Sequence, residues 1–516
     1  MSQLFKTKSL SQLVGETETP GQTLKRTLGP VQLTALGIGA IIGAGIFSTV
    51  GTAAAGGGEH IGAGPAVALS FVLTAIACGF AALCYAEFAA MVPVAGSAYT
   101  YAYATLGELI AWIIGWDLIL EYAIGNVAVA VSWSGYFQEL LRGLGIAWPA
   151  WLGMDFRTAI QASEQVHAAQ AAHVDLATLG PVVAHAYQAY LSAPRLGGLP
   201  IVFDLPAFSI VALITWVLVR GIQESAWLNS AMVALKLVII AFFVIVGAFY
   251  VKPANWHPFA PNGFKGISNA AAIIFFAYIG FDAVSTAAEE ARNPQKDMPI
   301  AMIASLVVCT VIYIVVAIVL TGLLNYKFLD TAEPLATAFS GIGMNWAAGI
   351  VSLGAVFATT SVLVVFQLGQ PRIFFSMARD GLLPPWAARV HPKYRTPYVT
   401  TILTGVFVAA FASISNINEV VELTNIGTLF AFALVSIGIV VLRRTNPDQH
   451  RPFRTPLVPL VPVLSVFMCV YLMTELPVIT WIRFVVWLAI GLVIYYMYGA
   501  HHSELRKESA AVDGSA

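Results

Sequence analysis

Two glycine-containing stretches place main-chain groups where they could bind a charged ligand. Residues 37–47 read GIGAIIGAGIF, with four glycines in an otherwise apolar run, and residues 275–290 read FFAYIGFDAVSTAAEE. Glycine weakens a helix, and interrupted backbone inside a membrane is tolerated only where it lines a protein cavity. The spacing GxGxxxG, without a strand before it, excludes a dinucleotide-binding turn. Both stretches therefore predict a cavity.

The two stretches could hold the opposite ends of one ligand. If the first helix unwinds at 43–45, the free N–H groups at the start of its outer half attract an anion such as a carboxylate. In the second stretch the break should leave carbonyl groups unpaired around Phe276, Ala277 and Ile279, and unpaired carbonyls suit an ammonium group. A ligand with a carboxylate and an ammonium on adjacent atoms is an α-amino acid.

The composition is that of a membrane protein. Of 516 residues, 58% are hydrophobic and 10% are charged, whereas about 25% of a soluble domain is charged. The formal net charge of -1 excludes a strongly basic nucleic-acid binder. The first 28 residues are polar and lack the apolar core of a signal peptide, so we expect the first apolar run to stay in the membrane.

Twelve runs are apolar and long enough to cross a bilayer, which needs roughly 20 residues. An even number of spans puts both termini on one side of the membrane. Most lysines and arginines fall on that same side, so the positive-inside rule places both termini in the cytoplasm. We predict an all-α polytopic protein of the cell's inner (plasma) membrane. The runs lie at about 32–56, 65–91, 106–138, 205–221, 228–251, 269–290, 300–324, 346–370, 398–416, 420–442, 456–475 and 479–499.

The first and sixth of the predicted helices are the interrupted ones. Because they stand five helices apart, they occupy equivalent positions in two five-helix halves. Five is an odd number, so the two halves cross the membrane in opposite directions. Paired interruptions at equivalent positions indicate a transport site between inverted repeats, as in the leucine-transporter-type fold. Close helix packing through Gly39 and Gly43 is the alternative for the first stretch alone. The predicted divisions are a cytoplasmic segment 1–28, a first repeat 29–251, a second repeat 252–443, two extra helices in 444–500 and a cytoplasmic tail 501–516.

Residues 142–204 do not fit the spanning pattern. They are rich in alanine, glutamine and histidine, and we predict an outer-face loop with one or two surface helices, inserted in the first repeat. Its histidines, His167, His173 and His185, are spaced by six and twelve residues. These spacings match no compact metal-ligand pattern, so we expect no metal site.

Five motifs together resemble the bacterial members of the cationic amino acid transporter branch of the amino acid–polyamine–organocation superfamily. The similarity covers roughly residues 27 to 500 apart from the long loop, and the branch name does not establish that this member carries cations. The motifs are GIGAIIGAGIF, ALCYAEFA (82–89), IIGWDLILEY (113–122), FFAYIGFDAVS (275–285) and PRIFFSMARDGLLP (371–384). The resemblance implies that the substrate carboxylate is held at Ile42, Gly43, Ala44 and Gly45, and its amino group at Phe276, Ala277 and Ile279.

Lys236 is a cation deep inside the fifth predicted helix, roughly 13 Å from its cytoplasmic start. An ammonium at mid-bilayer costs about 2.5–3.5 kcal/mol, so a lysine at this depth is expected to have a functional role. A lysine that can lose its proton between helices 1, 5 and 8 could replace a coupling sodium ion. The resemblance implies the same, with Ser361 and the backbone near Ile41 as neighbours. A purely structural lysine is the alternative. We expect no cofactor, with the proton as coupling ion.

Four of the carboxylates within the apolar helices are candidates for a functional role. Asp117 and Glu121 are spaced i, i+4, so they share a face and would repel if both were ionised. They could brace helix 3, recognise a basic substrate or belong to a proton relay, and we favour Glu121 near the site. Asp282 could cap the inner half of the sixth helix. Glu87 is either a cytoplasmic gate or a packed, paired carboxylate.

Phe366 bears on substrate size. By the resemblance it falls where the substrate side chain points, and a bulky aromatic there would shorten the pocket and disfavour arginine or lysine. Ordinary helix packing is the alternative interpretation.

These observations predict a secondary transporter that moves an L-amino acid inward with a proton by alternating access. An amino acid or polyamine exchanger is the alternative, as is a non-transporting amino acid sensor on the same fold. An enzyme is not expected, because the chain has no HExxH, no GxSxG with partner residues and no cysteine–histidine arrangement. We expect no nucleic-acid partner. A small accessory membrane subunit or a homo-oligomer is left open.

Overall fold

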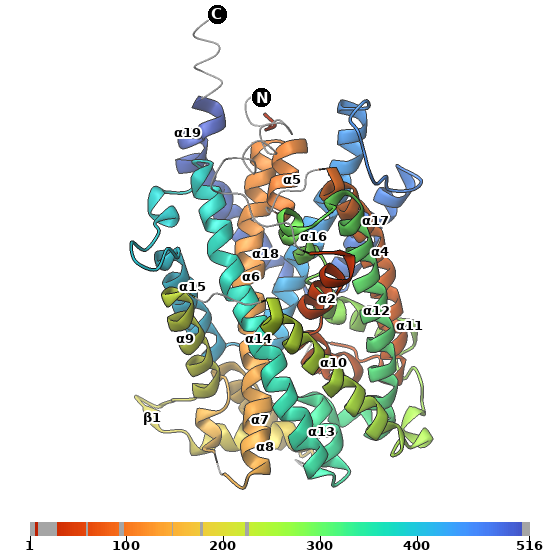
Figure 1. Cartoon of the computed structure of the whole chain (residues 1–516). Helices are drawn as coiled ribbons and strands as arrows, with labels where there is room; N and C mark the ends of the chain where they lie inside the picture. The colour runs from red at the N-terminus through yellow and green to blue at the C-terminus, as the bar shows by residue number, and fades with distance from the viewer. Residues whose placement is uncertain are drawn as a thin grey trace, which may run out of the picture.

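The computed structural model describes residues 6–8, 28–57, 60–91, 97–146, 148–175, 179–221 and 226–507. These residues form a helical bundle whose long helices run mostly along one axis (Figure 1), with one short antiparallel hairpin at its edge. The α-helices are α2 (Pro30–Ile41), α3 (Val50–Ala55), α4 (Val67–Met91), α5 (Ser97–Thr105), α6 (Glu108–Gly143), α7 (Phe156–Ala171), α8 (Gly180–Ser192), α9 (Leu205–Arg220), α10 (Ala226–Ala248), α11 (Gly263–Ile274), α12 (Pro294–Leu323), α13 (Pro334–Gly341), α14 (Asn345–Arg379), α15 (Tyr398–Ile414), α16 (Ile417–Thr445), α17 (Leu460–Thr474), α18 (Val478–Ile494) and α19 (Ala500–His502). The strands are β1 (Arg195–Leu196) and β2 (Leu199–Pro200).

Short turns of tighter or wider helix connect or extend these elements. The 3₁₀ turns are η2 (Gly64–Ala66), η3 (Ala150–Leu152), η5 (Pro253–Trp256), η6 (Phe275–Tyr278), η7 (Asp282–Glu290), η8 (Tyr326–Phe328) and η9 (Pro385–Ala388), and the π turns are η1 (Gly45–Thr49) and η10 (Tyr495–Gly499).

The described helices are those of a membrane-spanning protein. Seven are long and apolar enough to cross a bilayer, and the bent pair Pro30–Ile41 and Gly45–Ala55 makes an eighth candidate. Three further apolar helices, α9, α15 and α17, are shorter. The total of twelve spans and their inverted repeat remain predictions.

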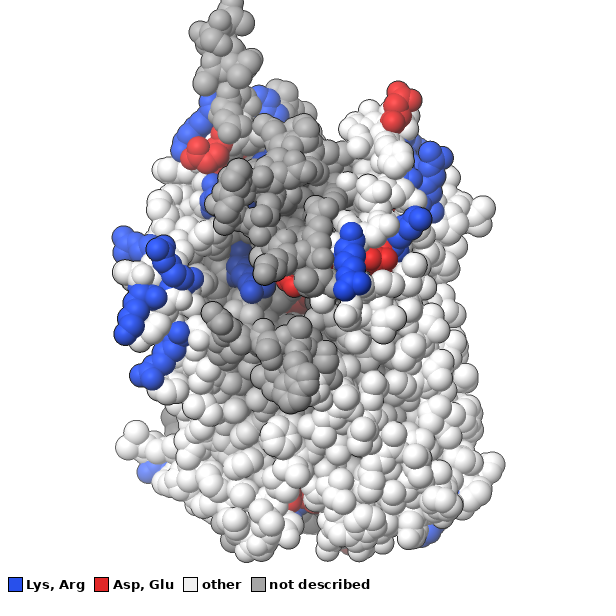
Figure 2. Space-filling view, in the orientation of Figure 1, with Lys and Arg blue, Asp and Glu red and all other residues white. Residues whose placement is uncertain are grey.

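The two ends of the described chain meet at one end of the bundle. Lys8 Nζ lies 3.3 Å from Asp380 Oδ1, and the Glu504 N–H donates to the Asp380 carbonyl. On the face shown in Figure 2, most lysines and arginines lie toward this end, above a broad uncharged region. Most of the predicted segment 1–28 and part of the tail 501–516 lie outside the described residues.

The long predicted loop forms a cap at the opposite end of the bundle. It contains two helices, α7 and α8, and the hairpin of β1 and β2 (Figure 1). Asp155 starts α7 because its carboxylate accepts the Thr158 N–H at 2.8 Å, the usual N-cap bond. Arg157 then ties α7 to α16 through Glu419 at 2.6 Å.

Helix α6 is the central element, buried along most of its length. It packs against α14, α16, α5 and α15, while α12 packs against α4 and α2. Its Trp112 and Trp116 donate to main-chain carbonyls of Gly491 and Trp487, both at 2.9 Å. This central position places the two carboxylates of α6 in the interior of the bundle.

Candidate functional site

The first predicted break is present. Helix α2 ends at Ile41, Ile42 is extended, and the chain resumes as η1 and α3 at an angle of 42°. The first hydrogen bond of the outer part runs from Phe47 N–H to the Gly43 carbonyl at 3.3 Å. The amides at 43–45 precede that bond, and no carbonyl of the described chain accepts from them. They are the unsatisfied N–H groups of a helix start.

The second predicted break is present as well. Helix α11 passes into η6, which ends at Tyr278, and the chain resumes as η7. Between them Gly280 has a φ of +119°, and a Cβ there would lie 2.8 Å from the Ala40 carbonyl oxygen. Conformation and space both require glycine at this position.

Asp282 closes the second break. It was predicted to cap the inner half-helix, but it is the first residue of η7, and its carboxylate accepts the Gly280 N–H at 3.3 Å. This bond reaches back across the break.

The two breaks touch through their main chains. A Cβ on Gly45 would lie 2.2 Å from the Cα of Ala277, so only glycine fits. The Tyr313 hydroxyl of α12 lies 2.9 Å from both the Ile41 carbonyl and the Ala277 carbonyl. The sequence did not point to Tyr313, and the expectation that the Ala277 carbonyl is unpaired is wrong. For Ile279, no donor to its carbonyl is found among the described residues.

Tyr313→Phe should loosen the joint between the breaks. Loss of the hydroxyl leaves buried carbonyls without their donor, which costs about 1–3 kcal/mol. We expect a lower free energy of unfolding and a lower Tm in the purified protein, together with weaker substrate binding. Tyr250→Phe, which changes an exposed tyrosine, is the control. A Tyr313→Phe protein with unchanged Tm and affinity would contradict the bridging role.

A small cavity lies beside the breaks and brings several predicted residues together. Its volume is about 20 Å³, enough for about one water molecule, so an amino acid enters only if the surrounding helices move apart. Phe366 packs edge-on against Tyr122 with ring centroids 5.4 Å apart. The lining residues are Gly39, Ala40, Glu121, Tyr122, Ile279, Gly280, Asp282, Val362, Val365 and Phe366.

Lys236 is buried and reaches the edge of this cavity. Its ammonium donates to the Gly39 carbonyl at 2.8 Å, and Gly39 lines the cavity. The predicted backbone neighbour, Ile41, lies one half-turn further on, where its carbonyl is bound by Tyr313. No hydrogen bond joins Ser361 to Lys236 within the described chain. The coupling roles of Lys236 and Ser361 remain predictions.

Glu87 is a packed and paired carboxylate. It accepts two bonds from Arg443, at 3.1 and 2.7 Å, and one from the Thr455 N–H at 2.7 Å. Arg451 Nε lies 3.3 Å away. This network fixes the C-terminal end of α4, and a gating role for Glu87 remains a prediction.

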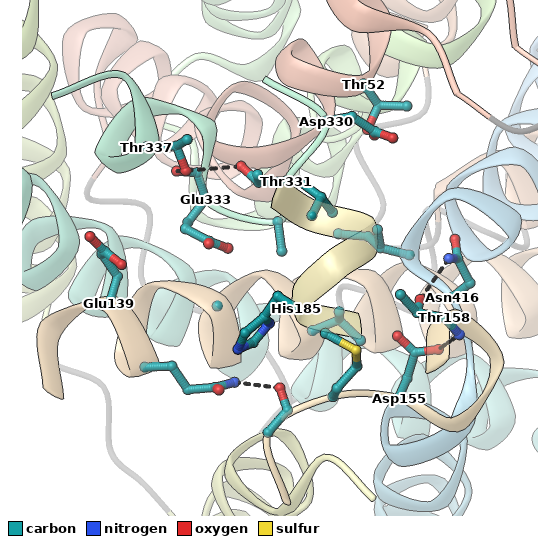
Figure 3. Close-up of a pocket in the computed structure, with 18 of the residues that line it drawn as sticks. Thr52, Glu139, Asp155, Thr158, His185, Asp330, Thr331, Glu333, Thr337 and Asn416 are labelled. Carbon is teal, nitrogen blue, oxygen red and sulfur yellow. Dashed lines mark hydrogen bonds between the residues drawn. The ribbon is translucent and has the colours of Figure 1, made fainter. Parts of the chain in front are cut away.

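A larger cavity of about 790 Å³ lies under the cap formed by α7 and α8. Beside it, the Ser48 hydroxyl contacts the Ser132 hydroxyl at 2.5 Å and the carbonyl of the lining residue Ala332. The sequence did not indicate this cavity, because its walls come from distant segments. Figure 3 shows His185 of α8 near the centre of the view, with Glu139, Asp155, Asp330 and Glu333 around it. The charged and titratable residues that line it are Glu139, Arg142, Asp155, His185, Asp204, Asp330 and Glu333.

The cap should become less stable as the pH rises. Burial raises the pKa of Asp155 to about 7, so folding binds protons between the unfolded value of about 4 and 7. Stability is therefore greatest below that window and falls as pH rises through it. We expect faster hydrogen exchange in α7 at pH 8 than at pH 5, after correction for intrinsic rates.

Asp155→Asn should remove this dependence while keeping the N-cap, because asparagine caps as well as aspartate. Glu164→Gln, on the same helix, should leave the dependence intact. A dependence that persists in Asp155→Asn would contradict the assignment to Asp155.

The geometry is that of a polytopic membrane protein with a buried site between two discontinuous helices, an arrangement found in secondary transporters. The sequence profile of the amino acid permeases matches residues 28–497, and the chain belongs to this family. This confirms the resemblance to the amino acid–polyamine–organocation superfamily. The family and the relatives described below are named as permeases or transporters and not as enzymes.

Three relatives illustrate the range of the family. The branched-chain amino acid permease BcaP of Bacillus subtilis (strain 168) is 46% identical over 506 residues, which cover 98% of this chain and 99% of the relative. The methylthioribose transporter of the same organism is 44% identical over 508 residues, covering 98% and 100%. Cationic amino acid transporter 2, vacuolar, of Arabidopsis thaliana is 37% identical over 439 residues, covering 84% and 62%.

Proposed function

We propose that this chain is a proton-coupled symporter that brings a neutral L-amino acid into the cell by alternating access. It acts in the plasma membrane with both termini in the cytoplasm, through twelve spans arranged as a five-plus-five inverted repeat and two extra helices. The observation that carries the proposal is the contact between two interrupted helices, where glycine-only positions bring free main-chain groups together.

The zwitterion is bound by main-chain groups at both ends. The amides at 43–45, with the extended residue Ile42, face the carboxylate, since helix starts favour anions. The ammonium binds carbonyls of the second break at Phe276 and Ile279. The Ala277 carbonyl is bound by Tyr313, so Ala277 contributes close packing against Gly45.

A neutral side chain suits this cavity better than a cationic one. Phe366 lines the cavity opposite the breaks and limits the length of side chain that fits. The name of the 46% identical relative, a branched-chain amino acid permease, supports the same preference. Methylthioribose, which the name of another relative specifies, is a sugar without the two charges that these breaks would bind.

Lys236 carries the coupling proton in this proposal. Its ammonium bonds the carbonyl of Gly39, in the inner half of the first helix, so its charge state can bias that half-helix between two positions. No cofactor takes part, and an accessory subunit or homo-oligomer is not required by the site.

Uptake into proteoliposomes tests the proposal. Labelled leucine, alanine, arginine and methylthioribose are offered with an inward proton gradient, with the gradient collapsed, and with amino acid inside but no gradient. We expect gradient-driven accumulation of leucine or alanine and little of the other two. Accumulation that needs internal amino acid and ignores the gradient would favour the exchanger. Binding without uptake or counterflow would favour the sensor.

A further inference from the structure

Asp117 of α6 is an isolated carboxyl group in the described interior of the bundle. Its side chain is fully buried, and neither carboxylate oxygen has a hydrogen-bond partner among the described residues. It lies against α16 at Gly427, where a Cβ would come within 2.6 Å of Asp117 Oδ1. An ionised carboxylate without donors in an apolar interior costs far more than it can recover, so such a group holds a proton.

Asp117 is connected through Glu121 to the small cavity beside the breaks, which is called the central cavity below. The two carboxylates are one helical turn apart, about 6 Å along α6, and side chains at that spacing meet. Glu121 and Asp282 both line the central cavity. Asp282, Glu121 and Asp117 thus form a series of carboxylates that extends from the second break into α6.

The order of residues along α6 gives this series a direction. The helix begins at Glu108, which is bonded to Arg506 at 2.9 Å at the end of the bundle where the described termini lie. Asp117 lies between Glu121 and Glu108 in the sequence, so a proton that passes from Glu121 to Asp117 moves toward the termini.

Among the described residues, no cation on the helices around α6 is bonded to Asp117. Helix α16 has no charged residue between Glu422 and Arg443. The tyrosines of α5 are Tyr101, Tyr99, which is bonded to Asp380, and Tyr103, which is bonded to Glu108. The cations of the neighbouring helices are Arg220 of α9, which lies over Trp216, Arg483 of α18, which is bonded to Glu419, and two residues of α14, the exposed Arg372 and Arg379 at its end. Helix α15 contributes Tyr398, which packs against His391.

We propose that Asp117 is the station through which the coupling proton leaves the central cavity toward the cytoplasm, an inference that rests on the proposed symport. Asp117 first releases its proton to water at the cytoplasmic end when that side opens. The O–H bond of the Glu121 carboxyl group then breaks as an O–H bond forms on Asp117. One proton moves one turn along α6, and Glu121 is left ready for the next.

Asp117→Asn separates this role from packing, because asparagine keeps the shape of the neutral acid and cannot carry a proton. A gradient of one pH unit can drive about tenfold accumulation for one proton per substrate. We expect Asp117→Asn to keep exchange of internal for external amino acid within about twofold and to lose the tenfold accumulation. Asp297→Asn changes a buried carboxylate that is bonded to the Asn293 N–H at 3.1 Å, and should accumulate like the unmodified protein.

Each outcome decides the proposal. Asp117→Asn that accumulates normally overturns it. If this variant does not exchange, Asp117→Ser is the second test, and loss of exchange in both would assign Asp117 to structure and overturn the proposal. If the unmodified protein does not accumulate at all, proton coupling itself fails. The infrared carbonyl band of a protonated carboxyl group then decides separately whether Asp117 holds a proton, since Asp117→Asn must lose that band.

Discussion

Lys236→Ala is expected to keep substrate binding and to lose accumulation driven by a proton gradient. The ammonium is buried against the Gly39 carbonyl, and alanine cannot exchange a proton there. For one proton per substrate, a gradient of one pH unit supports about tenfold accumulation, and the variant should fall to a ratio near one. Uptake of labelled substrate into proteoliposomes, with and without the gradient, measures this ratio.

The control for this prediction is Lys265→Ala, which removes an exposed lysine and should accumulate normally. Unchanged accumulation in Lys236→Ala across a proton gradient would exclude Lys236 from coupling. A variant that also loses exchange in the absence of a gradient would indicate a structural lysine.

Gly45→Ala should weaken binding strongly, although alanine is the smallest side chain that can be added. The added methyl carbon would lie 2.2 Å from the Ala277 Cα, a backbone atom that cannot move aside without separating the breaks. Overpacking costs typically 1–3 kcal/mol, or about 5- to 150-fold in affinity, and contact with backbone places this variant at the upper end. Thermal shift with added amino acid measures the loss.

Gly79→Ala is the matched control, because a Cβ there meets nothing within 4 Å, and its affinity should equal that of the unmodified protein. Gly43→Val should abolish binding, because a Cβ there already comes within 2.9 Å of Val362 and valine adds two further methyl groups. Normal affinity in Gly45→Ala would show that the breaks need not touch for the ligand to bind.

The sequence was most informative where backbone chemistry determines structure. Glycines within apolar runs predicted both breaks, because unpaired main-chain groups inside a membrane are costly. Gly280 shows why this works, because its φ of +119° is a conformation that glycine adopts without strain and other residues rarely adopt. The number of spans is harder to predict, since α9, α15 and α17 are short and only seven or eight described helices meet the length and hydropathy expected of a span.

Contacts between distant segments could not be predicted. Tyr313 is an ordinary aromatic residue in an apolar helix, and only the packing of α12 shows that its hydroxyl joins two breaks. The partner of Lys236 was placed near Ile41 and is Gly39, because the sequence does not fix the rotation of α10 against α2. Glu87 was left between two roles for the same reason, since its arginine partners are more than 350 residues away.

A structure determined with bound leucine tests the central claim most directly. We predict that both helices remain interrupted, with the leucine carboxylate within hydrogen-bond distance of the amides at 43–45 and its ammonium at the carbonyls of Phe276 and Ile279. Continuous helical hydrogen bonding through 41–46 and 276–282, or leucine bound only in the outer cavity beneath α7 and α8, would contradict the account.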